Sequence, residues 1–194
     1  MARSWYPGRD NSSGTVPPLA PVFTYYPTID GSSIGLTASP LDCIKAGKFN
    51  RVPTIMGTNQ DEGTIFLFVI PFLYTKHQIG LPVTARGLHE CLSHVFSNST
   101  TINRIYDAYP RKKLINQNVR AAAILRDFIF VCPTRRALAA IEKQGFGSTW
   151  QYRFSYPHVN PPGLGDYHAS EIGFVFRHLK ENLHYKESLQ TEGQ

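Results

Sequence analysis

Two adjacent carboxylates lie between apolar segments near the first third of the chain. Asp61 and Glu62 follow the apolar residues 52–56 and precede the strongly apolar residues 65–70. This order predicts a strand, a turn punctuated by glycines and then a helix. Acidic side chains are rarely placed so close to a core unless they have a partner. Asp61 suits an N-cap on the following helix, whereas Glu62 is either a second cap or the acid of a Ser–His–acid triad.

A histidine about a hundred residues further along could supply the base of such a triad. His168 lies in a connection rich in proline and glycine, after a predicted strand at 149–156 and before a helix-like segment. One alternative is a solvated surface histidine. Another is a metal ligand together with Glu171, at the i, i+3 spacing of a helix, but two ligands without a third make a weak metal site. We therefore predict no metal and no cofactor.

Five segments in order resemble the type-B carboxylesterase/cholinesterase family of α/β hydrolases. Residues 57–66 resemble its G-T-N-x-D-E-G-T-x-F block, which holds the family's acid, and residues 168–176 resemble its H-x-x-E-I-x-F-V-F block, which holds the base. The P-x-x-D-G segment, the lead into the acid strand and the D-x-x-F-x-C-P helix are matched by residues 26–31, 46–53 and 127–133. The resemblance implies that Glu62 is the catalytic acid and His168 the catalytic base.

The resemblance also implies the fold class, α/β. We expect an incomplete α/β-hydrolase fold, with the C-terminal strands of the sheet and a mostly helical insertion between the acid strand and the base strand. Apolar spacing, caps and prolines predict helices at 40–48, 84–96, 101–109 and 118–131, and another that opens at Pro133. Because the carboxyl ends of parallel strands meet at one edge of a sheet, the two loops can converge despite the insertion.

The nucleophile of the triad is missing from the matched segments. The family's serine lies in a G-x-S-x-G elbow, and the formal match here is Gly31 to Gly35, centred on Ser33. An elbow needs a buried strand directly before it and a helix directly after it. Pro27 would spoil a central strand, and Pro40 follows closely. We therefore reject Ser33 as a decoy and expect no nucleophile in this chain.

The expected function is that of part of a serine carboxylic-ester hydrolase. The chain would supply the acid and base of a Ser–Glu–His triad and would be inactive alone, whereas the full-length parent would act on a small-molecule ester. The alternative is a catalytically dead, esterase-like interaction or adhesion protein. The aromatic residues Phe66, Phe68 and Phe72 are expected in the core, with a pocket lining as the alternative.

Composition is consistent with a globular chain. Its 194 residues suggest one domain or part of one, and 42% hydrophobic residues suffice for a core. We expect a disordered segment at 1–20, the hydrolase portion at 21–180 and a polar tail at 181–194.

The net charge of +6 is spread along the chain, which argues against nucleic acid binding. No apolar run reaches the length of a membrane span, and the N-terminus lacks the apolar region of a signal peptide. Localisation and oligomeric state stay open.

Cysteines and sequons give weaker information. An odd set of three cysteines, Cys43, Cys91 and Cys132, cannot form a closed internal set of disulfides. In the family, the cysteine matched by Cys132 often pairs with one nearer the C-terminus, and no cysteine follows it here. Asn11 and Asn98 begin glycosylation sequons, which hint at a secreted parent.

Overall fold

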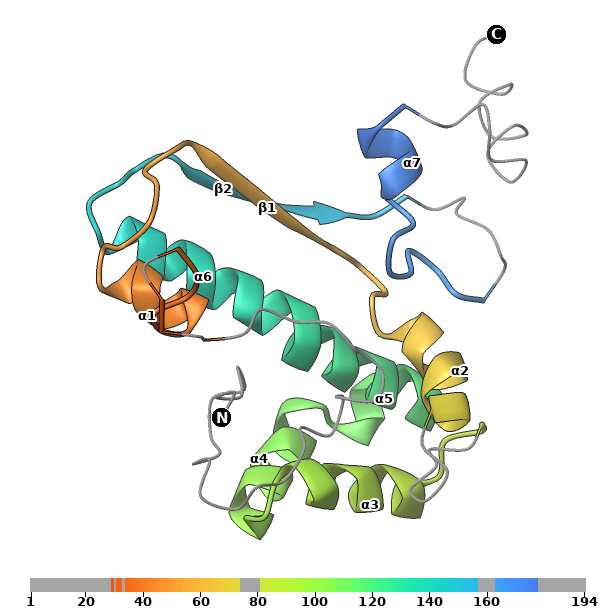
Figure 1. Cartoon of the computed structure of the whole chain (residues 1–194). Helices are drawn as coiled ribbons and strands as arrows, with labels where there is room; N and C mark the ends of the chain where they lie inside the picture. Colours follow the sequence, from red (N-terminus) through yellow and green to blue (C-terminus); the bar gives the residue numbers. More distant parts are fainter. Residues whose placement is uncertain (1–28, 30, 33, 74–80, 157–162, 178–194) are drawn as a thin grey trace, which may run out of the picture. The chain divides into compact units, whose positions relative to one another are not determined.

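A computed structural model describes residues 29, 31–32, 34–73, 81–156 and 163–177. Within these residues most elements are helical, and a run of helices separates the two strands along the chain (Figure 1). The elements are, in order, α1 (Pro40–Lys45), β1 (Thr54–Asn59), α2 (Thr64–Leu73), α3 (Ala85–Val95), α4 (Ser99–Ala108), the short 3-10 turn η2 (Arg111–Lys113), α5 (Gln117–Arg126), the π-helical turn η3 (Asp127–Val131), α6 (Cys132–Glu142), β2 (Thr149–Phe154) and α7 (Ile172–Val175).

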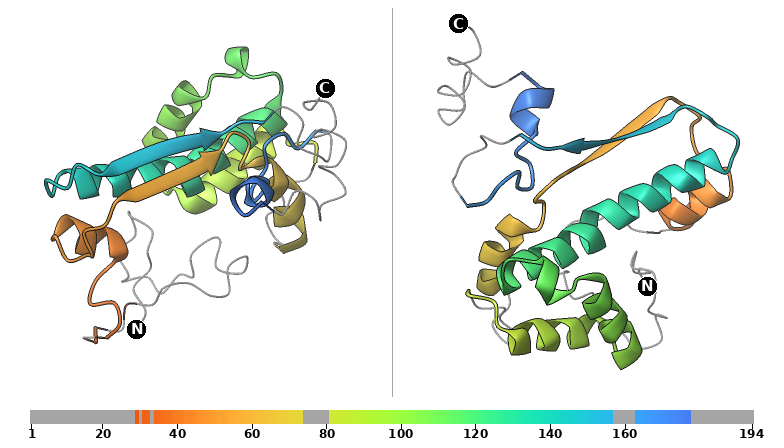
Figure 2. Two further views of the ribbon diagram at one scale, coloured as in Figure 1. Left: turned by 90° about the horizontal axis from the view of Figure 1, so that it is seen from above. Right: turned by 180° about the vertical axis from the view of Figure 1, so that it is seen from behind.

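The two strands pair side by side and run in the same direction (Figure 2). Their parallel register follows from two backbone bonds: Thr54 N donates to Ser148 O at one end, and Gln60 N donates to Phe154 O at the other, at 2.9 Å each. The carboxyl ends of both strands therefore lie at the same edge. The acid turn leaves β1 there, and the base loop follows β2 from the same edge, as predicted.

The helices that lie between β1 and β2 in the sequence form the hydrophobic core. Buried apolar residues from α2 to α5 form one cluster: Leu67, Val83, Leu88, Leu92, Ile102, Ala121, Ala122 and Ile124. In this cluster α2 packs against α5 and α3 packs against α4. The start of the helix predicted at 84–96 is confirmed, since Thr84 caps α3 and its hydroxyl accepts a hydrogen bond from Gly87 N. The next helix, α4, begins two residues earlier than predicted because Asn98 caps it.

The helix predicted at 118–131 contains a change of pitch. Its last five residues form η3, and Cys132 N donates to Asp127 O, the i→i−5 bond of a π turn. The helix predicted to open at Pro133 is α6, which begins one residue earlier at Cys132 and follows η3 directly. A proline inside an α-helix clashes with the carbonyl four residues before it, and the wider π turn directly before Pro133 relieves that crowding.

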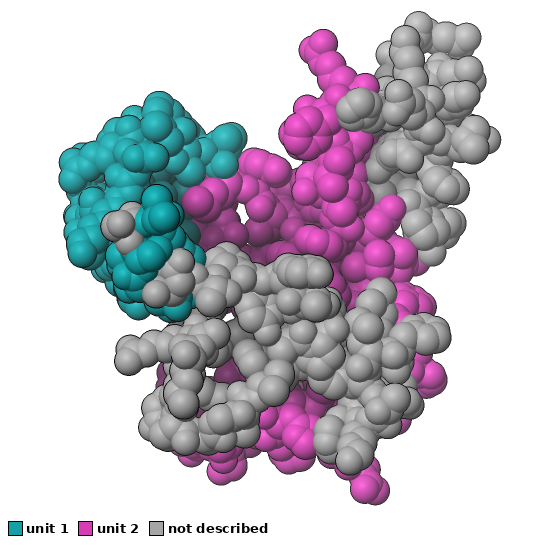
Figure 3. Space-filling view, in the orientation of Figure 1, with its two compact units in different colours: residues 1–55, 135–150 teal, residues 56–134, 151–194 magenta. Residues whose placement is uncertain are grey.

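The chain divides into two compact units (Figure 3). Unit 1 comprises residues 1–55 and 135–150, and unit 2 comprises residues 56–134 and 151–194. In unit 1, Gln144 Nε2 donates to Lys45 O at 2.9 Å, and Gly47 follows α1 with a φ of +72°, a conformation that glycine adopts without strain. Unit 2 holds the helical core and both loops of the candidate site. Among the described residues, no helix is long and apolar enough to cross a membrane.

Two sequence predictions near the acid turn are wrong in detail. The strand predicted at 52–56 begins at Thr54 and continues through Gly57 to Asn59, because those residues still pair with β2. Asp61 is not the cap of α2. The helix begins three residues later at Thr64, and the Asp61 carboxylate instead accepts a hydrogen bond from Asp166 N at 3.1 Å. The predicted disordered segment at 1–20, the polar tail at 181–194 and Ser33 lie outside the described residues.

Candidate active site

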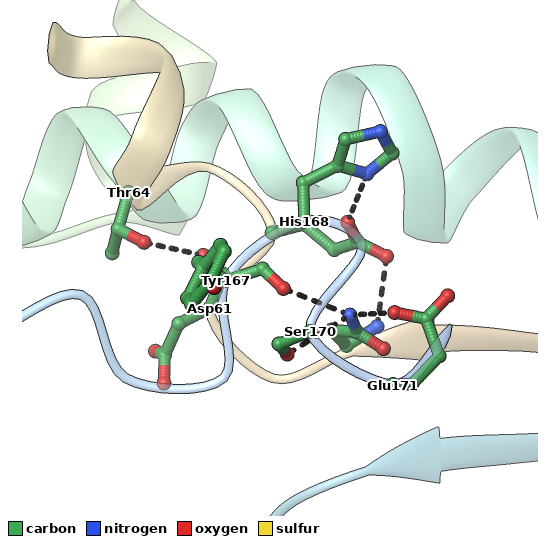
Figure 4. A network of polar contacts seen from close by, with 8 residues as sticks. Asp61, Thr64, Tyr167, His168, Ser170 and Glu171 are labelled. Carbon is green, nitrogen blue, oxygen red and sulfur yellow. Dashed lines mark hydrogen bonds and ion pairs between the residues drawn. The ribbon is translucent and has the colours of Figure 1, made fainter. Parts of the chain in front are cut away.

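The acid and the base meet at the carboxyl edge of the two strands (Figure 4). Glu62 Oε2 lies 2.7 Å from Nδ1 of His168, although the two residues are 106 positions apart in the chain. Because a carboxylate only accepts hydrogen bonds, Nδ1 carries the proton in this contact. The basic nitrogen of the neutral imidazole is then Nε2. The sequence predicted this pairing of residues, and the structure brings them together.

The acid is buried and held in one orientation. Glu62 is only 5% exposed, and its second oxygen, Oε1, accepts a hydrogen bond from Asn59 N at 2.8 Å. One oxygen is therefore fixed by the end of β1 while the other faces the imidazole. A carboxylate that is bonded at both oxygens can be buried at lower cost than an unpaired one.

The base is more open than the acid. The His168 side chain is 44% exposed. Two aromatic rings lie against the imidazole: the centroid of Phe130, from η3, is 4.8 Å from that of His168, and the centroid of Phe66, from α2, is 5.4 Å from it. Phe66 is buried, as predicted for a core residue. Phe68 is half exposed, contrary to that prediction, and the side chain of Phe72 lies outside the described residues.

Electrostatics favour the protonated imidazole. The hydrogen bond to the Glu62 carboxylate raises the pKa of His168 above its usual value, and the negative charges of Glu62 and Glu171 add to this effect. Burial opposes the shift because it disfavours the charged form. The imidazolium, which a general base becomes when it takes a proton, is thus stabilised in this position.

Hydrogen bonds between the two loops fix their spacing. Asp61 N donates to Asp166 O at 3.0 Å, and Asp166 N donates to Asp61 Oδ2 at 3.1 Å. The Thr64 hydroxyl bridges the same gap by donating to Leu164 O at 2.7 Å. At Gly165, where φ is +62°, a Cβ atom would lie 2.2 Å from Asp61 Oδ2, so only glycine fits this approach.

The metal alternative for His168 and Glu171 has no third ligand in the part of the chain that the model describes. There, no group of three His, Cys, Asp or Glu residues is placed to hold a metal ion. The Glu171 carboxylate is turned to Asn59, whose Nδ2 donates to Glu171 Oε2. Cys43, Cys91 and Cys132 are free cysteines in the described structure.

Sequence reasoning assigned no role to two residues of the site. Asn59 and Phe130 both lie inside the motifs that indicated the family, yet their contacts are with residues far along the chain. The only local sign was an amide directly before the acid turn and an aromatic residue inside an otherwise helical pattern. Neither sign distinguishes a site residue from a core residue.

Comparisons with known proteins agree with this geometry. The model of the carboxylesterase family matches residues 10–191. The chain is 30% identical to secreted lipase 1 of Botryotinia fuckeliana over 89% of this chain and 32% of the lipase. It is 25% identical to the acetylcholinesterase of Leptinotarsa decemlineata over 80% of this chain and 26% of that protein. The chain thus spans about a third of the length of the first of these relatives and about a quarter of the second.

A solved structure has the same fold. A PNB esterase structure matches with a TM-score of 0.54 and 22% identity, over 79% of this chain and 29% of that chain. This likeness confirms the predicted fold class, a partial α/β-hydrolase fold with a small parallel sheet and a helical insertion. Together with the family match over residues 10–191, it establishes that the chain belongs to the carboxylesterase family.

Proposed function

We propose that Glu62 and His168 are the acid and base of a Ser–Glu–His triad in a carboxylic-ester hydrolase. The observation that carries the proposal is the contact of 2.7 Å between the buried Glu62 carboxylate and His168 Nδ1. The acid fixes the tautomer of the imidazole and stabilises the imidazolium, which are the two roles of the acid in such a triad. Membership of the carboxylesterase family supports an ester as the substrate class.

In the proposed reaction, Nε2 of His168 removes the proton from a serine hydroxyl as that oxygen attacks the ester carbonyl carbon. The same proton then passes from the imidazolium to the leaving alkoxide, so that an alcohol departs and an acyl-enzyme remains. A water molecule, activated by Nε2 in the same way, then attacks the acyl-enzyme, which releases the carboxylic acid product and restores the serine hydroxyl. Glu62 stays ionised throughout and holds Nδ1–H.

The serine is proposed to come from the part of the family's domain that this chain does not match. The chain covers 32% of the lipase from Botryotinia and 29% of the PNB esterase structure, and the sequence around its one formal G-x-S-x-G match, at Ser33, has prolines at positions 27 and 40 that do not suit the buried strand and following helix of an elbow. The 194-residue chain by itself is therefore expected to be inactive on esters.

A chimera tests the proposal. The stretch of the Bacillus subtilis para-nitrobenzyl esterase that matches this chain is replaced by residues 10–191, and hydrolysis of p-nitrophenyl butyrate is followed. We expect activity that falls by about 10³-fold or more in His168→Ala and also falls in Glu62→Gln. A folded chimera whose activity survives His168→Ala would contradict the assigned base. A folded chimera without activity would favour the interaction-protein alternative.

Fluorophosphonate labelling of the unfused chain is the companion experiment. No stoichiometric labelling is expected. Labelling at Ser33 would overturn both its rejection as a nucleophile and the proposed origin of the serine.

A further inference from the structure

A buried asparagine connects the acid to the base loop. Asn59 is the last residue of β1 and is 1% exposed, and it is the largest of the fully buried side chains in the described structure. Burying an amide is costly unless its hydrogen bonds are made inside the protein. An apolar residue would fill the same space at lower cost, so the contacts of Asn59 need a reason.

Those contacts reach both catalytic loops. The backbone N–H of Asn59 donates to Glu62 Oε1 at 2.8 Å. Its side-chain Nδ2 faces three oxygens of the base loop: it lies 2.9 Å from Tyr167 O, 3.4 Å from Ser170 Oγ, and within hydrogen-bonding distance of Glu171 Oε2 (Figure 4). The Tyr167 carbonyl belongs to the peptide that leads into His168. One residue thus fixes the acid from one side and the backbone next to the base from the other.

The orientation of the amide is set by this environment. Two of the three groups around Nδ2, the Tyr167 carbonyl and the Glu171 carboxylate, can only accept a hydrogen bond, so a donor is favoured there; the Ser170 hydroxyl can either accept or donate. The other end, Oδ1, is buried and has no hydrogen-bond partner among the described residues. Burying Oδ1 without a partner costs free energy, whereas Nδ2 makes its hydrogen bonds to the base loop. This asymmetry indicates that donation to the base loop, rather than simple filling of the core, selects asparagine.

We propose that Asn59 is a positioning residue that sets the distance between Glu62 and His168 by tying the end of β1 to the base loop. The inference rests on the proposed triad for its catalytic meaning, because Asn59 acts only through the acid–base pair. The paired strands fix where the two loops begin. The Asn59 side chain fixes where the second loop lies 108 to 112 residues later in the chain.

The test is an NMR titration of His168 in the full 194-residue chain. Glu62→Gln, which removes the charged acceptor, defines the complete loss of coupling. We expect Asn59→Leu to reproduce most of the fall in the His168 pKa seen in Glu62→Gln and to remove the downfield Nδ1–H resonance. Asn59→Asp keeps the shape of the side chain but places an oxygen against the Tyr167 carbonyl and the Glu171 carboxylate, so it removes donation without removing the packing. Because its added negative charge raises the pKa of His168 by itself, this variant is read by the Nδ1–H resonance, which we expect to be lost.

The matched control is Asn116→Leu. Asn116 caps α5 by accepting a hydrogen bond from Val119 N, and among the described residues its side chain has no hydrogen bond to either loop of the site. This variant loses stability like any lost cap, but the titration of His168 should stay that of the wild type. If Asn59→Leu folds and titrates like the wild type, and Asn59→Asp folds and keeps the Nδ1–H resonance, the inference is overturned and Asn59 is only a core residue.

A second pair of variants decides the question if the Asn59 variants do not fold. Glu171 is only partly buried, and its carboxylate accepts from Asn59 Nδ2. Glu171→Gln and Glu171→Ala both remove a charge near His168, but only Gln keeps an acceptor for the amide. A weaker Nδ1–H resonance in Glu171→Ala than in Glu171→Gln supports the positioning role of the Asn59 hydrogen bonds. Identical resonances in the two variants overturn it.

Failure of this inference and failure of the proposed function give different results. The titration needs no ester turnover, so it reports on positioning even in an inactive chain. If a chimera is inactive although Glu62 still raises the pKa of His168, only the proposed function is contradicted. If a chimera is active and the raised His168 pKa survives Asn59→Leu, only the positioning role of Asn59 is contradicted.

Discussion

Replacing Gly63 with alanine would drive a methyl group into the backbone of α5. Gly63 is buried directly after Glu62, and a Cβ atom built on it would lie 2.0 Å from Ala122 O, 2.8 Å from Ala122 C and 3.0 Å from Ala122 Cα. Real Cβ atoms do not approach a neighbour more closely than 3.0 Å. The acid turn and α5 would therefore have to separate by at least about 1 Å.

The cost of this separation is expected at the upper end for an overpacked core. Such substitutions typically cost about 1–3 kcal/mol, and here the obstacle is main chain that cannot rotate away. We expect a loss of about 3 kcal/mol in the free energy of unfolding. The acid moves with the turn, and a hydrogen bond of 2.7 Å that lengthens by 1 Å is no longer a hydrogen bond. The His168 pKa should accordingly fall toward its usual value.

Urea unfolding and the NMR titration of His168 measure the two effects together. Gly147→Ala is the control: a Cβ atom there meets nothing within 4 Å, and the residue does not need a positive φ. The control should keep both the stability and the titration of the wild type. A Gly63→Ala chain as stable as the wild type, with an unchanged His168 titration, would refute the argument that close backbone approach places the acid.

Three more outcomes follow from the same contacts. Because Glu62 raises the pKa of His168 in the folded state, the ion pair contributes stability that is fully present below the unfolded pKa of about 6.5 and is lost as pH rises through the folded value. The contribution should be under about 1 kcal/mol for a half-exposed imidazole, and the difference between wild type and Glu62→Gln in urea unfolding from pH 5.5 to 9 measures it. Phe130→Leu should cost about 1 kcal/mol in urea unfolding, and the His168 proton resonances should lose the part of their ring-current shift that Phe130 contributes, while the part from Phe66 remains. Gly57→Ala should cost less than Gly63→Ala, because its Cβ meets the half-exposed ring of Tyr152 at 1.9–2.2 Å; a Tyr152→Ala background should abolish that cost in a double-mutant cycle.

The acid–base pair could be predicted because both residues follow strands of one parallel sheet. Glu62 leaves the carboxyl end of β1 and His168 follows the carboxyl end of β2, and this topology brings the loops together whatever the helices between them do. The helix starts at Thr84, which caps α3, and at Pro40, the first residue of α1, were also readable, since local chemistry sets them.

Glycine was the misleading signal. Gly57 suggested a turn, yet it lies inside β1 where the Tyr152 ring approaches the strand too closely for any side chain. A glycine in a strand can mark such an approach as well as a turn, and sequence alone does not separate the two. Asp61 misled in a similar way, because its carboxylate found a partner 105 residues away instead of the helix beside it.

The π turn was unreadable for a different reason. Pro133 predicted a helix start, and the structure keeps the helical path by widening the turn before the proline. That change of pitch places Phe130 in η3 against the imidazole. The contact depends on an adjustment in backbone hydrogen bonding, which leaves no trace in the apolar period.

The contrast between a buried acid and an open base fits the chemistry that the pair is proposed to perform. Glu62 never has to change partners during acyl transfer, and it is held at both oxygens and 5% exposed. His168 must exchange a proton with a serine and then with an alcohol or water, and its side chain stays 44% exposed. The hydrogen bond at Nδ1 and the rings of Phe66 and Phe130 restrict its orientation, while Nε2 remains as the nitrogen that can take a proton. Fixing one nitrogen so that the other is available is what a general base requires.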